Sequence, residues 1–217
     1  TEIYTLSLHD ALPIFIATRN GMVKKTVLSE FDSPRTGLIG ITLGEGDEVV
    51  NACLTDGNQE VILVTRRGQA IRFREEETRP MGRIARGVHG VALEDGDLVV
   101  AMDVVRPDGD LLVTSELGFG KRTPLSEYRI TGRGGKGIRT LNVAEKNGEI
   151  VGAVVVGEQD EVMIISSSGV MIRIAVADVP EQGRSTMGVR LMKLDEGQKV
   201  VTLALIAARD DEQASNR

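Results

Sequence analysis

Glycines recur along this sequence with a period of about fifty residues, and they form two series that keep a constant phase. The first series is Gly21, Gly68, Gly118 and Gly169, and the second is Gly37, Gly87, Gly137 and Gly188. Self-similarity of this kind is typical of a chain built from repeated structural units. The sequence therefore predicts four repeats, at 15–60, 61–109, 110–160 and 161–207.

The residues around both series are typical of short β-strands. Around each glycine of the first series, two runs rich in apolar residues flank a turn, as in "VILVTRRGQAIRF", which predicts a hairpin. Each glycine of the second series is followed by spaced apolar residues, a polar turn such as "EDGD", and another apolar run. No helical periodicity of useful length occurs, so four short strands per repeat predict an all-β, propeller-like array of about four four-stranded blades.

Composition excludes several classes of function. Aromatic residues are only 3% of the chain and Trp is absent, so platforms for stacking unpaired bases are not expected. No apolar run approaches roughly 18 residues, so no membrane span is expected. A single cysteine, Cys53, rules out an internal disulfide framework and fits a reducing cytoplasm. One cysteine and two histidines cannot form a usual zinc site. The net charge of −6 does not by itself exclude nucleic acid as a partner, because what matters is where the charges lie.

The two ends of the chain differ from the repeats. Residues 1–14, "TEIYTLSLHDALPI", lack the strand rhythm and resemble the in-frame translation of a sequencing adapter, so we expect a non-native segment there. The alternative is a native N-terminal tail. Residues 208–217 are expected to form a polar, acidic C-terminal tail.

Every repeat carries a cation four residues after its first-series glycine, and in two repeats a lysine precedes it. These six residues are Lys24, Lys25, Arg72, Lys121, Arg122 and Arg173. In "AIRFR" the cation alternates with apolar residues, which places it on the face of the strand opposite the core. Stacked repeats would then present one continuous basic track. The alternative is a set of solvated edge charges that prevent aggregation.

A second basic motif precedes the second-series glycine in three repeats: "GRIARG", "GRGGKG" and "GRSTMG". Its outer glycines are explained first by the turns between strands. The third repeat additionally inserts Gly134 and Gly135, which would let backbone N–H groups approach an anion, while Arg133 and Lys136 add charge. This combination suits a DNA phosphate backbone, whereas a nucleotide P-loop would need a Ser or Thr after the lysine and a following helix.

With this motif the sequence resembles a known family, the C-terminal DNA-wrapping domain of bacterial DNA gyrase A. "TGRGGKG" matches five of seven positions of that family's Q-R-R-G-G-K-G box, departing at Thr131 and Gly132. "GKRTPLSEYR" and "GVRLMKL" add to the resemblance, which covers residues 15–207 and corresponds to the last four of six blades. The corresponding C-terminal domain of topoisomerase IV is similar and is the second choice.

The resemblance implies a β-pinwheel, a partial six-bladed disc whose blades exchange strands, with double-stranded DNA bent around its rim. It further implies the partners of a bacterial, nucleoid-associated and cytoplasmic type II topoisomerase: the rest of gyrase A, and gyrase B, in a heterotetramer. The catalytic tyrosine, ATP and Mg²⁺ would belong to other parts of that isomerase, and Tyr128 is no substitute for the tyrosine. No catalytic, metal or cofactor site is expected in this chain.

We therefore expect phosphate contacts, without base reading, that serve ATP-dependent negative supercoiling by the parent enzyme. The predicted DNA-binding residues are Lys24, Lys25, Arg72, Lys121, Arg122, Arg133, Gly134, Gly135, Lys136, Arg139 and Arg173. Two alternatives stay open: a protein-binding propeller scaffold, which lacks a Trp-Asp or Gly-His signature here, and a propeller enzyme, for which His89 would be an isolated candidate.

Overall fold

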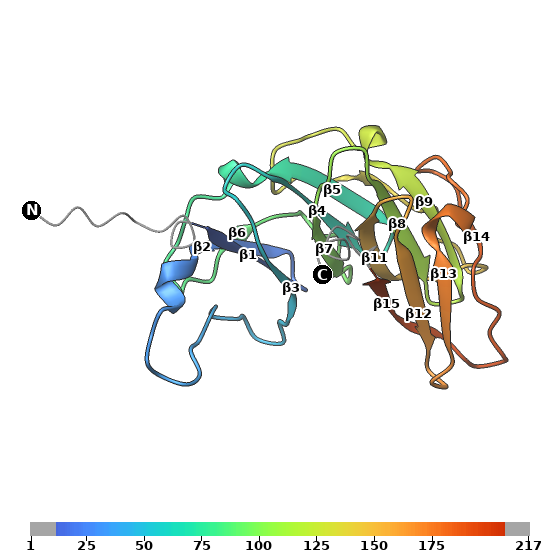
Figure 1. The fold of residues 1–217 in the computed structure, drawn as a ribbon, viewed down its shortest axis with the longest axis horizontal. Coiled ribbons are helices and arrows are strands. Elements are labelled where there is room, and N and C mark those ends of the chain that lie inside the picture. The colour runs from blue at the N-terminus through green and yellow to red at the C-terminus, as the bar shows by residue number, and fades with distance from the viewer. Residues whose placement is uncertain (1–11, 207–217) are drawn as a thin grey trace, which may run out of the picture. The chain divides into compact units, whose positions relative to one another are not determined.

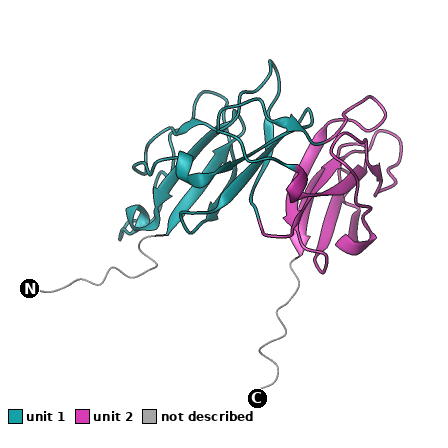
Figure 2. Cartoon of the chain, turned by 90° about the horizontal axis from the view of Figure 1, so that it is seen from above, with its two compact units in different colours: residues 1–105, 128–140 teal, residues 106–127, 141–217 magenta. Residues whose placement is uncertain are grey.

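A computed structural model of the chain describes residues 12–206, and its regular elements there are short strands and single turns of 3-10 helix (Figure 1). The strands form antiparallel sheets, which confirms the all-β prediction. The chain divides into two compact units, residues 1–105 with 128–140 and residues 106–127 with 141–217 (Figure 2). No helix in the described part of the chain is long and apolar enough to cross a membrane.

Each sheet is built on a hairpin, and the last strand of the same repeat pairs with the first strand of that hairpin. In the first sheet of unit 1 the strand order is β3 (Val49–Leu54), β1 (Pro13–Thr18), β2 (Met22–Val27) and β6 (Val88–His89). In the second sheet of unit 1 the strand order is β10 (Ile138–Arg139), β5 (Gln69–Arg74), β4 (Glu60–Thr65) and β7 (Val99–Val104). In the first sheet of unit 2 the strand order is β11 (Ile150–Val156), β8 (Asp110–Ser115), β9 (Phe119–Pro124) and β14 (Val189–Arg190). In the second sheet of unit 2 the strand order is β13 (Met171–Ala175), β12 (Glu161–Ser166) and β15 (Val200–Ile206). A 3-10 helix follows each hairpin: η1 (Leu28–Phe31), η2 (Glu75–Glu77), η3 (Leu125–Glu127) and η4 (Val176–Asp178).

Three of the four sheets are completed by a strand from the next repeat. β6 joins the sheet of the first repeat, β10 joins that of the second and β14 joins that of the third. The residue just after each exchanged strand donates a backbone hydrogen bond of 2.8 Å to a first-series glycine carbonyl: Gly90 to Gly21, Thr140 to Gly68, and Leu191 to Gly118. This is the strand exchange that the resemblance implied. It also explains why residues 128–140 belong to unit 1 although they come from the third repeat.

The glycine before each exchanged strand has a steric role. Gly137 has φ of +76°, and a Cβ atom built there would lie 2.5 Å from the carbonyl oxygen of Ala70 on the strand that β10 joins. Only glycine allows both the left-handed backbone and this close approach. The second glycine series therefore marks the points where the chain crosses into the neighbouring blade.

The structure differs from the expected four-stranded blades in two places. The fourth sheet has three described strands, because no described residue supplies the exchanged strand next to β13. Residues 37–43, which correspond in the repeat to the exchanged strands, form no strand. A further difference concerns the first sheet: β1 begins at Pro13, so Pro13 and Ile14, which we had assigned to a foreign segment, pair with Val27 and Thr26. Residues 1–11 and 207–217 lie outside the described part.

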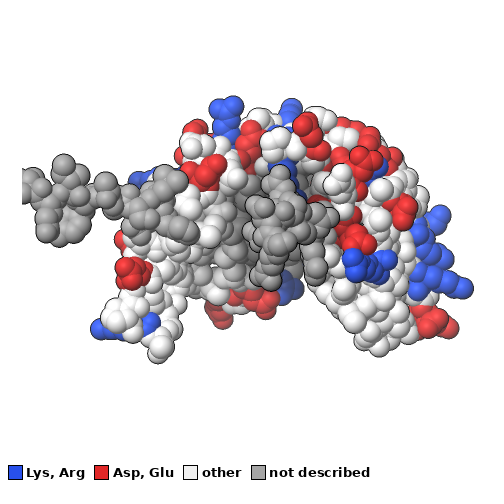
Figure 3. All heavy atoms as spheres, viewed as in Figure 1, with Lys and Arg blue, Asp and Glu red and all other residues white. Residues whose placement is uncertain are grey.

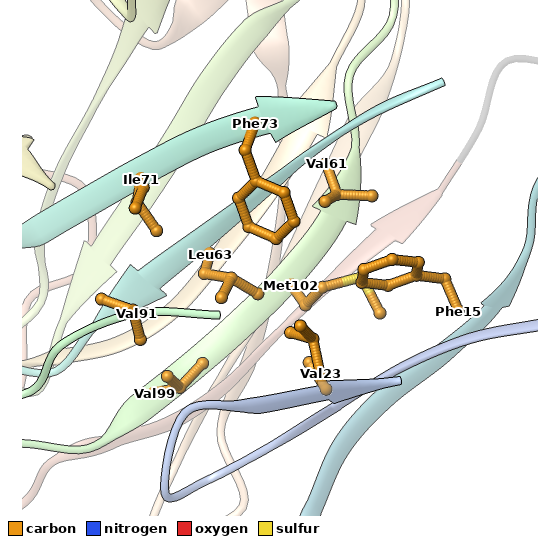
Figure 4. Packing of buried hydrophobic residues seen from close by; sticks show 10 residues of the cluster. Phe15, Val23, Val61, Leu63, Ile71, Phe73, Val91, Val99 and Met102 are labelled. Atoms are coloured by element: carbon orange, nitrogen blue, oxygen red, sulfur yellow. The ribbon is translucent and has the colours of Figure 1, made fainter. Parts of the chain in front are cut away.

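Strand alternation generates the core of unit 1. Ile71 and Phe73 on β5 are 1% and 0% exposed, and the cation between them, Arg72, points to the other face. These side chains pack with residues of the first two repeats, including Phe15, whose ring centroid lies 6.3 Å from that of Phe73 (Figure 4). Val91, just after an exchanged strand, joins the same cluster, so strand exchange also closes the apolar core. Unit 2 has separate clusters around Leu112 and Ile164.

Candidate nucleic-acid interface

The arginines of the predicted basic track form ion pairs within their own hairpins. Arg72 lies 2.5 Å from a carboxylate oxygen of Glu60, Arg122 lies 2.5 Å from one of Asp110, and Arg173 pairs with Glu161. The three acids occupy the same place in the repeat, eight residues before the first-series glycine. The Arg72 and Arg122 side chains are only 16% and 17% exposed. Most of their charge is therefore already neutralised.

Lys25, the equivalent cation of the first repeat, is 5% exposed. Its ammonium donates a hydrogen bond of 3.0 Å to the Glu75 carbonyl and lies 4.0 Å from the Glu75 carboxylate. The physical reason is common to three repeats: the connection leading to the next exchanged strand runs over this position and forms isolated bridges at Lys25–Pro80, Arg72–Ile130 and Arg122–Glu181. The sequence-based prediction of an exposed track is wrong for these three cations, because the next repeat covers them.

Lys24 and Lys121 are both 0% exposed, which also contradicts the prediction of an exposed track. The Lys121 ammonium donates to the carbonyls of Gly183 and Arg184 at 2.5 and 2.9 Å, and Lys24 donates to those of Gly40 and Arg83. Burial, with a contribution from Arg83, lowers the pKa of Lys24. Burial lowers the pKa of Lys121 to about 8, with Glu127 opposing the shift and Arg184 adding to it. Both lysines fasten the next repeat's connection instead of facing solvent.

The Gly-Arg motif has a similar structural role. The Arg133 guanidinium donates to the carbonyls of Glu77 and His89 at 2.9 and 3.0 Å, and Arg83 donates to the carbonyl of Ile39 at 2.6 Å. The acceptors His89 and Ile39 are equivalent in the repeat, two residues after the second-series glycine. This arginine therefore clamps one repeat to the segment that the preceding repeat exchanges, and it is not freely available to an anion.

The backbone groups of the inserted glycines, Gly134 and Gly135, are only partly available to an anion. The Gly134 N–H donates to the Gly90 carbonyl at 2.7 Å, and the Gly135 carbonyl accepts from Ala92 at 2.9 Å. The prediction that the backbone N–H at Gly134 approaches a phosphate is therefore wrong, since a neighbouring segment already uses that group. Lys136, between these glycines and Gly137, is exposed and forms no hydrogen bond or ion pair with the described residues.

Of the predicted contact residues, three keep exposed side chains: Lys136, Arg139 and Arg173, the last being 62% exposed despite its ion pair. Tyr128 is 2% exposed, and its hydroxyl lies 2.5 Å from the Thr140 hydroxyl, so it fills the protein interior. Cys53 is half-buried, and burial raises the pKa of its thiol to about 11. Among the described residues, no cluster of acidic, His or Cys side chains is arranged to hold a metal ion.

A second set of six exposed cations lies on the exchanged strands and on the connections that lead to them, and sequence reasoning had named only two of the six, Lys136 and Arg139. They form exposed pairs at equivalent places in adjacent repeats: Arg79 and Arg129, Arg86 and Lys136, Arg139 and Arg190. Arg190 also lies 5.4 Å from the centre of the Phe119 ring. In the face shown in Figure 3, basic side chains gather on the part of unit 2 that carries β13 and β14. Asking for cations at a constant distance from the second glycine series would have found these pairs.

Antiparallel sheets built around a hairpin, three of them completed by a strand from the next repeat, define this chain as a strand-exchanged propeller-like protein, a β-pinwheel. A family model described as the DNA gyrase C-terminal domain, beta-propeller, matches residues 13–52, 59–106, 109–157 and 160–207. The chain belongs to this family.

Individual relatives agree with this assignment. DNA gyrase A of Mycolicibacterium smegmatis is 45% identical over 208 residues, which cover 94% of this chain and 25% of that protein. DNA gyrase A of Staphylococcus epidermidis is 43% identical over 201 residues, covering 91% and 22%. The chain thus spans about a quarter of the length of the curated relatives it matches.

Two solved structures resemble the fold closely. A crystal structure of the C-terminal domain of DNA topoisomerase IV is 30% identical with a TM-score of 0.88, covering 93% of this chain and 64% of that one. A structure of a DNA gyrase A C-terminal domain is 29% identical with a TM-score of 0.85, covering 93% and 68%. The two folds are equally good matches, so the fold does not separate the two types of topoisomerase.

Proposed function

We propose that this chain binds double-stranded DNA through the phosphate backbone and bends it, as the DNA-wrapping part of a type II topoisomerase of the gyrase kind. The family supports DNA as the ligand. The observation that carries the proposal is the repetition of exposed cations on the exchanged strands and on the connections before them, at equivalent places in adjacent repeats. Such repetition offers phosphates a series of similar contacts.

The chemistry of these contacts favours binding without sequence reading. Arg and Lys neutralise phosphates and release counterions, which supplies affinity that does not depend on base identity. Smooth bending of roughly 20–30 bp costs on the order of 1–6 kcal/mol, so several phosphate contacts are needed to offset it. In the parent enzyme, wrapping would bias which DNA segment is passed through the cut and so set the sense of supercoiling, in the bacterial cytoplasm with the other gyrase components as partners.

The proposed contact residues differ from the sequence-based set. They comprise Arg79, Arg86, Arg129, Lys136, Arg139, Arg173 and Arg190, all exposed. The buried and ion-paired cations stabilise the repeats instead. Gyrase is preferred over topoisomerase IV because the relatives reported above are gyrase proteins and because "RGGKG" at 133–137 retains most of the gyrase box.

The test is a fluorescence-anisotropy titration of a short labelled duplex at two salt concentrations. The double variant Arg86→Glu/Lys136→Glu is compared with Arg74→Glu/Lys146→Glu, which changes the charge equally at exposed sites outside the connections. We expect salt-dependent binding that the first variant weakens by about tenfold or more and the control weakens far less. Salt-independent binding, or equal losses in the two variants, would contradict the proposed interface.

A further inference from the structure

Every repeat carries an acidic residue nine positions after its first-series glycine, as the third residue of the 3-10 helix that follows the hairpin. These residues are Glu30, Glu77, Glu127 and Asp178, and all four are exposed. In the second and third repeats the acid is followed two residues later by a proposed DNA contact, Arg79 or Arg129. A carboxylate repels phosphates, so an acid that recurs at this place must have a role other than direct contact with DNA.

In the second repeat this acid, Glu77, holds the start of the connection 132–137. The Arg133 N–H donates to a carboxylate oxygen of Glu77 at 2.9 Å, and a Cβ atom built on Gly132 would lie 3.6 Å from the same oxygen. The Arg133 guanidinium donates to the main-chain carbonyl of Glu77, also at 2.9 Å. Glu77 therefore holds Arg133 by both its main chain and its side chain, and all of these residues belong to unit 1.

The same contact recurs in unit 2, between the third and fourth repeats. The Arg184 N–H donates to a carboxylate oxygen of Glu127 at 3.2 Å, and the same oxygen lies 3.7 Å from the Arg184 guanidinium. Glu127 and Arg184 occupy the places of Glu77 and Arg133 in the repeat. Its recurrence makes the contact a property of the repeat and not of one loop.

The connection 132–137 depends on its acid more than the connection 183–188 does. In the third repeat, the Lys121 ammonium donates to two carbonyls of the connection 183–188 and so holds it at a second point. In the second repeat the place of that lysine is taken by Ile71, which is 1% exposed and cannot donate a side-chain hydrogen bond. The Glu77 carboxylate therefore anchors the start of its connection without help from a lysine.

This anchor controls where Lys136 lies. Main-chain hydrogen bonds at Gly134 and Gly135 hold the middle of the connection, and Glu77 fixes its start. Two consecutive glycines have the greatest backbone freedom of any residues, so loss of the fixed start lets this part of the chain sample many more conformations. DNA binding would then have to order the connection again, at a cost in affinity.

We propose that Glu77 is a positioning residue for DNA binding: its carboxylate fixes the start of the connection 132–137 and so holds Lys136 where a phosphate can reach it. This inference rests on the proposed function, in which Lys136 is a DNA contact. Its consequence is opposite to that of charge repulsion alone, because removing the negative charge of Glu77 weakens DNA binding instead of strengthening it.

The test compares Glu77→Ala with Glu76→Ala in the anisotropy titration. Glu76 is the neighbouring exposed acid, and it forms no hydrogen bond or ion pair with the residues that the structure describes. The two variants change the charge equally. Glu76→Ala should bind the duplex as tightly as the unchanged chain or slightly more tightly, whereas Glu77→Ala should bind about fivefold more weakly. Glu77→Gln keeps an oxygen that can accept from the Arg133 N–H, so it should recover most of the lost affinity.

A double-mutant cycle separates positioning of Lys136 from a general loss of structure. In the Lys136→Gln background the phosphate contact is already absent, so adding Glu77→Ala should weaken DNA binding little further. A fivefold loss in both backgrounds would mean that Glu77 acts through something other than Lys136 and would overturn the inference. Equal strengthening of binding by Glu77→Ala and Glu76→Ala would overturn it as well.

Limited trypsin digestion examines the connection without DNA. Cleavage after Lys136 should be faster in Glu77→Ala than in the unchanged chain or in Glu76→Ala, because local opening exposes the backbone to the protease. Cleavage after Lys146, an exposed lysine in unit 2, is the internal reference and should not change. Normal, salt-dependent DNA binding with no change of cleavage or affinity in Glu77→Ala would overturn only the role of Glu77. Salt-independent binding by the unchanged chain would overturn the proposed function, and the positioning role with it.

Discussion

The same residue type plays different roles in this chain according to what the next repeat places over it. Arg72 and Lys136 are both cations within the repeated frame, but Arg72 is 16% exposed and paired with Glu60, whereas Lys136 is exposed and unpaired among the described residues. A phosphate would have to displace Glu60 from Arg72. Burial and ion pairing of the individual side chain therefore separate cations that stabilise the fold from cations that are available to a ligand.

This distinction predicts different outcomes for two neutralising substitutions. Arg72→Gln leaves the mostly buried Glu60 without its partner and should destabilise the fold by about 1–2 kcal/mol, as measured by urea unfolding. Adding Glu60→Gln should recover part of that loss, which a double-mutant cycle quantifies. Lys136→Gln should leave stability unchanged and weaken DNA binding more than Arg72→Gln does. The reverse order of DNA affinities would restore Arg72 to the contact surface.

Lys121 gives a prediction about pH. Its pKa falls from 10.5 to about 8 in the folded chain, mainly through burial. Between these two values the unfolded chain binds more protons than the folded one, so this residue makes stability rise as the pH increases through that range. In Lys121→Met the rise is absent, so the stability of the unchanged chain relative to the variant should be greater at pH 9.5 than at pH 7. The exposed Lys146→Met is the control, and a stability difference independent of pH would contradict the shifted pKa.

At the scale of elements, the structure depends on very short strands. β6, β10 and β14 contain two residues each, yet each closes a sheet and carries a connection that covers a cation of the preceding repeat. Their position is set by the glycine before them, which allows the backbone to approach the acceptor strand closely. Strand exchange is therefore most sensitive to change at this glycine.

Gly137→Ala should consequently be much more damaging than the same change at a glycine with open space. A Cβ at Gly137 would lie 2.5 Å from a backbone oxygen, whereas Gly46, with φ of +68°, has no atom within 4 Å of that position. Both substitutions incur the strain of a left-handed alanine, about 1 kcal/mol, but only Gly137→Ala must also move β10 away from β5. We expect about 3 kcal/mol for Gly137→Ala in urea unfolding and about 1 kcal/mol for Gly46→Ala. Equal losses would mean that the crossing does not require close approach.

The sequence predicts the strands better than their pairing. Alternation around Ile71, Arg72 and Phe73 identifies both the strand and its buried face, because those depend on local periodicity. That Arg72 is covered by a connection from the next repeat is a non-local fact, and the residue at the bridge, Ile130, has no local signature. The pairing of Arg72 with Glu60 could have been predicted from the sequence, because an acidic residue stands eight positions before the first-series glycine in three repeats. Strand exchange itself came from the family resemblance, because two-residue strands are too short to be recognised from their own sequence.

At the scale of the whole chain, the proposed DNA contacts are divided between the two units. Arg86 and Lys136 belong to unit 1, and Arg173 and Arg190, all exposed, belong to unit 2. If both units bind the same duplex, each double charge reversal should reduce affinity, and each should flatten the dependence of log K on log salt by about 2, since two phosphate contacts are lost. The four-site variant should then lose the sum of both effects in the anisotropy titration.

Bending provides the complementary measurement, because a duplex that contacts both units must follow the cations of each. A duplex of roughly 30 bp with a fluorophore pair at its ends should show increased energy transfer on binding the unchanged chain, since bending brings the ends together. Each double variant should reduce the transfer even at saturating protein, whereas the control Arg74→Glu/Lys146→Glu should not. A duplex that binds with normal salt dependence but shows no change in transfer would separate DNA binding from wrapping, because phosphate contacts made by one unit supply affinity without requiring the DNA to bend.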